Sequence, residues 1–124
     1  MRVDNQVVLR GRLTSAPKVR SLPSGSVLVQ LEITTPASDE ASSSARSAPV
    51  VWFDPPTRSG LGADTPVGTE LVVVGHVRRR YFRAAGTTQS RTEVVAEMVV
   101  RASRRREVER ALARAADALV APVA

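Results

Sequence analysis

The residues best suited to chemistry lie in one short run in which arginines meet aromatic side chains. Residues 78–82 read RRRYF. An aromatic ring can stack on the face of a base, and a guanidinium can contact a phosphate or itself stack on a ring. Side chains of these two kinds in one place favour contact with a nucleic acid over covalent chemistry.

The alternation of a strand divides this run into two halves. Successive side chains of an extended segment point to opposite faces. Arg78, Arg80 and Phe82 then share one face, whereas Arg79 and Tyr81 share the other. We predict that Phe82 stacks on a base and that the first face carries the binding. Packing at the rim of a sheet is the alternative for both aromatic side chains.

A second candidate comes from the short apolar run at residues 50–53, VVWF. Trp52 and Phe53 must face opposite sides of a strand. One is expected in the core and the other is a candidate for base stacking, and the pattern alone does not distinguish them. The residues predicted to bind nucleic acid are Arg10, Arg12, Arg46, Trp52, Phe53, Arg78, Arg80, Phe82 and Arg91.

The overall charge agrees with such a partner. The net charge is +6, and 17 of the 18 basic residues are arginine. A basic excess on a small domain favours a polyanion, because each neutralised phosphate releases condensed counterions. A genome rich in G and C raises the arginine content whatever the function, so the placement of the charges carries more weight than their sum.

Catalysis finds no support in the sequence. It contains no nucleophile elbow, glycine-rich phosphate loop or paired-carboxylate pattern, and its acidic residues are scattered. The single histidine, His76, has no ligand-type neighbour, and there is no cysteine. We therefore expect a protein that is not an enzyme, with no catalytic residues, no metal, no cofactor and no small-molecule substrate.

No targeting or membrane segment is predicted. Charges interrupt every apolar run of residues 1–13, which excludes a signal peptide and a membrane span there. The absence of cysteine fits a reducing compartment. We expect a cytoplasmic protein with no membrane partner.

The elements that must position these residues are short strands. Apolar and polar residues alternate in residues 3–13 and 27–34, and residues 18–22 form a shorter strand between them, which together predict a three-stranded meander. Residues 69–101 predict a long hairpin, in which Gly75 marks a bulge or a sharp bend.

Two segments between these strands are predicted to be loops. Residues 36–49 have almost no apolar bulk and predict a mobile loop. A passive linker and a flap that contacts nucleic acid through Arg46 are equally good interpretations. Residues 57–67 contain two glycines and one proline and show no helical period.

Five or six short strands in 124 residues predict one all-β domain, closed or nearly closed into a barrel. Residues 103–124 are expected to form a separate C-terminal segment after a domain of residues 1–102. Its amphipathic helix would pack through Val108, Leu112, Ala115 and Leu119. The helix is predicted to cap the barrel or join subunits, and phosphate contact by its arginines is the weaker alternative.

Ordered pieces of this chain resemble bacterial single-stranded DNA-binding proteins. The pieces are Asn5, Val7, Leu9, Gly11-Arg12-Leu13, Ala16-Pro17, Gly25, residues 27–33, the run at 50–53, Gly68, Leu71, Val73-Val74-Gly75, Val77, Arg80, Tyr81-Phe82, Gly86 and residues 92–96. The resemblance implies an oligonucleotide-binding fold, which is a five-stranded Greek-key barrel with an extended hairpin. It also implies a homotetramer that binds single-stranded DNA without strong sequence preference.

By position, the resemblance makes Phe53 and Phe82 stacking aromatics and places four arginines on strands that face DNA, namely Arg10, Arg12, Arg78 and Arg80. The chain also departs from the family pattern. Two further aromatics are missing, residues 54–66 replace a helix, and the glycine-rich tail with its acidic tip is expected to be absent. We therefore expect weaker, more salt-sensitive binding than is usual in the family, and we do not carry the family's role as a hub for partner proteins over to this chain.

Three functions stay open. The first is non-specific binding of single-stranded DNA in replication, repair or recombination. The second is an adaptor or oligomerisation module with weak or no DNA binding, and the third is an RNA-binding barrel. Because one such barrel covers only roughly 4 to 16 nucleotides, we expect a homo-oligomer, either a dimer or a tetramer.

Overall fold

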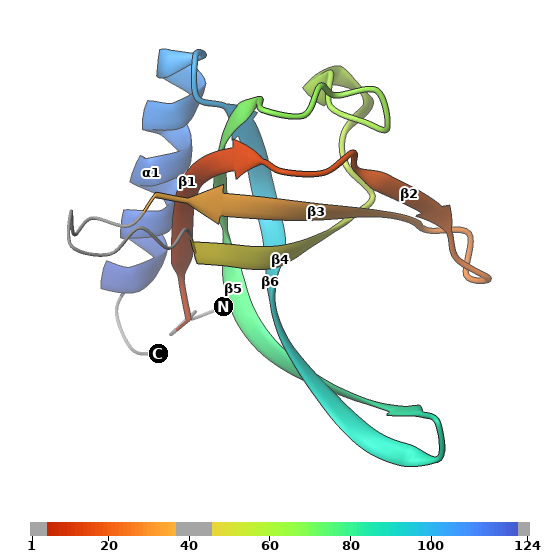
Figure 1. Ribbon diagram of the computed structural model, residues 1–124. Helices are drawn as coiled ribbons and strands as arrows, with labels where there is room; N and C mark the ends of the chain where they lie inside the picture. Colours follow the sequence, from red (N-terminus) through yellow and green to blue (C-terminus); the bar gives the residue numbers. More distant parts are fainter. Residues whose placement is uncertain (1–4, 37–45, 122–124) are drawn as a thin grey trace.

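The computed structural model describes residues 5–36 and 46–121 and consists, within them, of six strands and one α-helix (Figure 1). The elements are β1 (Val7–Leu13), β2 (Lys18–Ser21), β3 (Val27–Thr35), β4 (Arg46–Phe53), β5 (Glu70–Ala84), β6 (Thr87–Arg101) and α1 (Arg105–Val120), with a 3-10 turn at Thr57–Ser59.

The strands close into a barrel. Their order in the sheet is β1-β5-β6-β4-β3-β2, and β1 also pairs with β3. This last pairing, Arg12 with Thr34 and Leu13 with Ile33, joins five strands into a ring, and β2 pairs with the first half of β3 on the same edge. The predicted barrel is confirmed. The predicted meander is wrong in one pairing, because the end of β1 bonds to β3 rather than to β2.

Alternating side chains of the strands fill the barrel. At the closure point a Cβ on Gly11 would lie 2.4 Å from the carbonyl oxygen of Thr34, so only glycine lets β1 approach β3 there. The core is almost entirely aliphatic, which makes burial of apolar area its main source of stability. Its members include Leu13, Leu31, Ile33, Val50, Trp52, Leu71, Val73 and Val94.

The hairpin of β5 and β6 bends at Gly75, as predicted. The pairing register shifts by one residue between Val74 and Gly75, and Glu97 is the extra residue of the bulge. Beyond the bend the two strands leave the barrel as a two-stranded ribbon (Figure 1). The ribbon turns at Ala85 and Gly86, whose φ angles of 52° and 80° fit a two-residue hairpin turn.

Helix α1 packs on the outer face of β5 and β6 through alanine. Ala111 and Ala115 are buried against Val74, with Met98 beside them. The predicted packing face is wrong at two positions, because Leu112 and Leu119 are 42% and 56% exposed. Small side chains let the helix approach the sheet closely, and the larger leucines then lie on its flank.

The segments around β4 differ from expectation in one respect. Residues 54–66 contain no α-helix, as predicted. The strand β4, however, begins at Arg46, four residues before the predicted start at Val50, because β3 is long enough to pair with all of it. The rest of the predicted loop, residues 37–45, lies outside the described residues.

Candidate nucleic-acid interface

Two arginine–aromatic pairs lie where the β5–β6 ribbon leaves the barrel. The guanidinium carbon of Arg78 lies 5.5 Å from the centre of the Phe53 ring. That of Arg80 lies 5.0 Å from the centre of the Phe82 ring. Both distances are those of a cation held over an aromatic face. The four side chains come from β4 and β5, which β6 joins.

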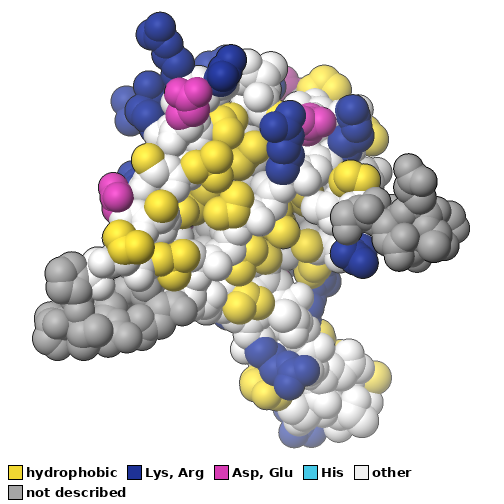
Figure 2. Space-filling model, turned by 90° about the vertical axis from the view of Figure 1, so that its left-hand side faces the viewer, with side chains coloured by type: hydrophobic (Ala, Val, Ile, Leu, Met, Phe, Trp, Pro, Cys, Tyr) yellow, Lys and Arg dark blue, Asp and Glu magenta, His cyan; other side chains and the backbone are white. Residues whose placement is uncertain are grey.

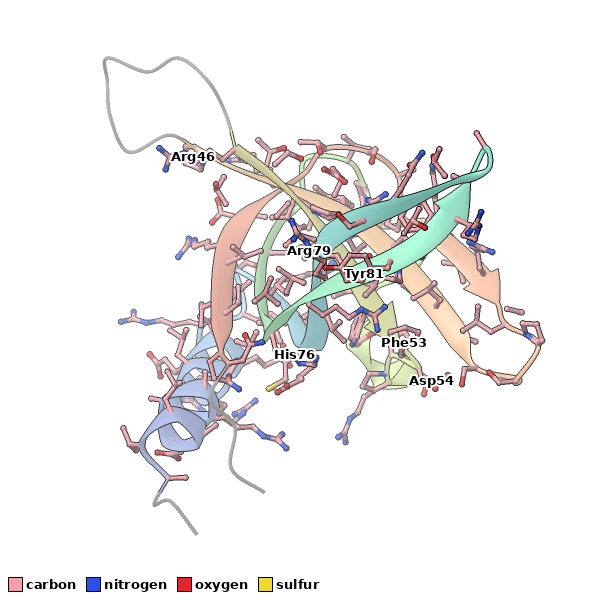
Figure 3. The ribbon with its side chains drawn as sticks, turned by 90° about the horizontal axis from the view of Figure 1, so that it is seen from below. Arg46, Phe53, Asp54, His76, Arg79 and Tyr81 are labelled. Atoms are coloured by element: carbon pink, nitrogen blue, oxygen red, sulfur yellow. The ribbon has the colours of Figure 1, made fainter. Side chains whose placement is uncertain are left out.

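The end of β4 is built to hold Phe53 in place. Asp54 adopts a left-handed φ of 48°, which aspartate tolerates better than most residues. Its backbone N–H donates to the carbonyl of Val27 at 2.8 Å, and its carboxylate accepts the Val27 N–H at 2.8 Å. These two hydrogen bonds fix the turn that follows Phe53. The exposed side chain of Phe53 lies beside Asp54 (Figure 3).

A buried carboxylate connects the two pairs. Nε and Nη2 of Arg78 donate to Oε2 of Glu93 at 3.0 and 2.8 Å. Nε of Arg80 lies 3.5 Å from the other carboxylate oxygen. The Glu93 side chain is only 1% exposed, whereas those of Arg78 and Arg80 are about two-fifths exposed. A buried charge needs such partners, since an unpaired one is costly.

We define these five side chains as the stacking cluster: Phe53, Arg78, Arg80, Phe82 and Glu93. Glu93 was not among the predicted site residues. It stands opposite Arg78 in the β5–β6 register. A hairpin whose turn is placed at Ala85 and Gly86 pairs these two positions, so the turn was the signal that could have found it.

The prediction that Trp52 binds nucleic acid is wrong. Its side chain is 3% exposed and belongs to the core. Strand alternation places one of the two neighbouring aromatics inside the barrel, and the register of β4 with β3 puts Trp52 beside the buried Val29. Phe53 is consequently the exposed partner.

Arg10 and Arg12 lie away from the stacking cluster. Their guanidinium groups approach the carboxylate of Glu70, at 2.6 and 3.8 Å. Glu70 precedes Arg78 by eight residues on β5, or roughly 26 Å along the strand. Helix α1 packs on Val74 between them. The structure therefore does not bring these two arginines to the aromatic side chains.

Arg46 and Arg91 occupy different positions relative to the cluster. Arg46 is exposed at the start of β4, at the opposite end of that strand from Phe53 (Figure 3). Arg91 is exposed and stands directly opposite Arg80 in the hairpin. With Lys18, Gln30 and Glu93 it lines a small cavity of about 120 Å³.

The other half of the predicted run faces away. Arg79 and Tyr81 alternate with the cluster residues on β5, and Tyr81 is exposed on the opposite face of the ribbon (Figure 3).

In the described ranges 5–36 and 46–121 there is no group of three or more potential metal-ligating side chains. The helix within those ranges is not long and apolar enough to cross a membrane.

A family model for the single-strand binding proteins matches residues 4–102, about four fifths of the chain. The chain belongs to the single-strand binding protein family. The match takes in all six strands and the whole stacking cluster, and it ends before α1. No curated protein matches the chain.

Membership in the single-strand binding family confirms the resemblance drawn from the sequence. It identifies the closed barrel as an oligonucleotide-binding fold with an extended hairpin and an added C-terminal helix. It also supports single-stranded DNA binding as the general function.

Proposed function

We propose that this member of the single-strand binding family holds single-stranded DNA on the stacking cluster, without reading its sequence. The observation that supports this proposal is the pair of arginine–aromatic contacts around Glu93. Every base has a π-face, so a stacked base contributes roughly 1 to 3 kcal/mol whatever its identity. Arginines of the hairpin add phosphate contacts. Such a protein would act as a binder in DNA replication, repair or recombination.

Two matched double variants test the proposal. Phe82→Ala with Arg80→Ala removes one of the two arginine–aromatic pairs, whereas Tyr81→Ala with Arg79→Ala removes an equal charge and one ring from the opposite face. We expect the first to weaken binding of a labelled single strand more than the second. Fluorescence anisotropy of the labelled oligonucleotide is the suitable readout, because Trp52 is buried.

Two further measurements define the ligand. Retention of duplex and single-stranded DNA to an equal extent would overturn the proposal. A matched RNA oligonucleotide tests the alternative of an RNA-binding barrel, since stacking and phosphate contact do not use the 2′-hydroxyl. RNA bound more tightly than DNA of the same sequence would favour that alternative.

The face that carries α1 and β1 supports self-association. Figure 2 shows hydrophobic side chains gathered on this face. Val8, Leu112 and Leu119 are exposed there. Strand β1 pairs with β5 along one edge, and only its last two residues pair with β3 along the other. We propose a dimer or tetramer that covers this edge and these side chains.

This exposed face also favours a second candidate, an adaptor or oligomerisation module. Leu112→Glu with Leu119→Glu separates the two ideas. If the protein is a self-associating single-strand binder, light scattering should show a lower molar mass for the variant than for wild type. The variant should bind long DNA less tightly but still bind a short oligonucleotide. An adaptor would lose self-association without any change in a DNA affinity that is already negligible.

A further inference from the structure

We propose that Arg78 and Arg80 are base-stacking surfaces rather than phosphate contacts, and that Glu93 is the residue that positions them. The inference rests on the proposed binding of single strands to this site and assigns its two central arginines a single role. Arg78 and Arg80 would stack on bases, and other basic residues would neutralise phosphates.

The hydrogen bonds of Arg78 carry the first step. Nε and Nη2 form the edge by which a guanidinium grips a carboxylate or a phosphate. Glu93 occupies that edge in Arg78, and it lies 3.5 Å from Nε of Arg80. In Arg78 the edge that best holds a phosphate is therefore already engaged inside the protein, whereas Arg80 approaches Glu93 only as an ion pair.

The orientation of the two groups carries the second step. Each guanidinium has one face over an aromatic ring. Glu93 holds the edge of Arg78 by hydrogen bonds and keeps Arg80 beside it by an ion pair, and the other face of each guanidinium is left as the accessible flat surface of a partly exposed side chain. A planar, delocalised cation in that position can stack on a base as an aromatic ring does.

The charge carries the third step. Two guanidinium groups share one buried carboxylate, so the site adds a net charge of about one rather than two. A buried ion pair contributes little net stability compared with apolar packing. The effect of Glu93 is therefore on the geometry and charge of its two partners.

Cations other than Arg78 and Arg80 would then neutralise the phosphates. Arg91 is one such cation, because it stands opposite Arg80 on the same hairpin and has no ion pair within residues 5–36 and 46–121. It is the natural comparison residue for a test that separates stacking from charge.

The salt dependence of binding separates the two roles. Affinity for a labelled oligothymidine is measured over a salt series. The slope reports about 0.7 per neutralised phosphate on a single strand, and the value extrapolated to 1 M salt reports the contribution that does not depend on charge. Wild type is compared with Arg78→Lys/Arg80→Lys, Glu93→Gln and Arg91→Gln.

The double lysine variant keeps both positive charges but replaces each planar guanidinium with an ammonium group. We expect its affinity at 1 M salt to fall at least about tenfold with the slope unchanged, since stacked bases are worth about that much or more. Arg91→Gln should lower the slope by about 0.7 and leave the 1 M value unchanged. Glu93→Gln should raise the slope, because it releases a guanidinium to phosphate, and lower the 1 M value.

The opposite pattern overturns the inference. A double lysine variant with wild-type affinity at 1 M salt would show that Arg78 and Arg80 act only as charges, and it needs no buried substitution. Glu93→Gln that folds, by thermal melting, yet changes neither slope nor 1 M value would remove the positioning role. A wild-type protein that binds no oligonucleotide even at low salt would overturn the proposed function as well.

Discussion

Replacing Gly75 with alanine should destabilise the barrel strongly, because there is no space for a methyl group at the bulge. A Cβ at this position would lie 2.0 Å from the carbonyl oxygen of Val95 and 3.0 Å from Cα of Ala96. Both atoms belong to the backbone of β6, so no side chain can rotate away. The φ of Gly75 is not positive, so the effect is steric rather than conformational.

The magnitude follows from this geometry. The backbone of β6 must move by about 1 Å, which strains the ladder on both sides of the bend. Overpacking costs about 1 to 3 kcal/mol. The loss of two backbone hydrogen bonds adds about 1 kcal/mol each. For a domain of this size, a loss of about 3 to 5 kcal/mol lowers Tm by roughly 10 to 20 °C.

Thermal unfolding followed by circular dichroism measures this loss. Gly62→Ala is the matched control, because its Cβ would meet only a carboxylate oxygen of Asp64, at 3.8 Å. We expect the control to unfold at the wild-type temperature or slightly above it. A Tm of Gly75→Ala within about 3 °C of wild type would refute the steric reasoning, since overpacking alone should cost more than that.

Three further substitutions probe other parts of the molecule. Phe53→Ala should weaken single-strand binding about fivefold or more in anisotropy while Tm changes little, because the ring is exposed and stacks on Arg78. Ala111→Asp should lower Tm by roughly 5 to 15 °C, because it buries an unpaired charge against Val74; an unchanged melting curve would mean that α1 does not pack there. Ala85→Gly should raise the free energy of unfolding by about 0.5 to 1 kcal/mol in denaturant titration, since Ala85 has a positive φ.

The barrel and the bend were predictable because they follow from local patterns. Alternation identifies a strand, and a glycine in mid-strand indicates a bulge, as Gly75 does. The choice between Trp52 and Phe53 was not predictable in the same way. Both faces of a short apolar strand look alike in sequence, and only the pairing with β3 decides which side chain is inside.

The parts that failed depend on tertiary contact. The buried stripe of α1 is centred on Ala111 and Ala115, whereas hydrophobic periodicity gave more weight to the larger Leu112 and Leu119. Glu93 was missed because a single acidic residue on a strand is usually solvated. Its burial depends on Arg78 and Arg80 reaching it across the hairpin.

The ribbon beyond the bend also has a consequence for how copies of this protein behave near one another. Strand β4 pairs with β6 only through Val94 to Ala96, and β1 pairs with β5 only as far as Gly75. The Asn5 side chain occupies the backbone N–H and C=O of Val77. Beyond Val77 the outer ribbon presents two rows of backbone N–H and C=O groups that can template another strand. Its arginines keep like ribbons apart by repulsion. Salt that weakens the grip on nucleic acid also screens this repulsion, so the free protein should be most prone to aggregate under the conditions that release it.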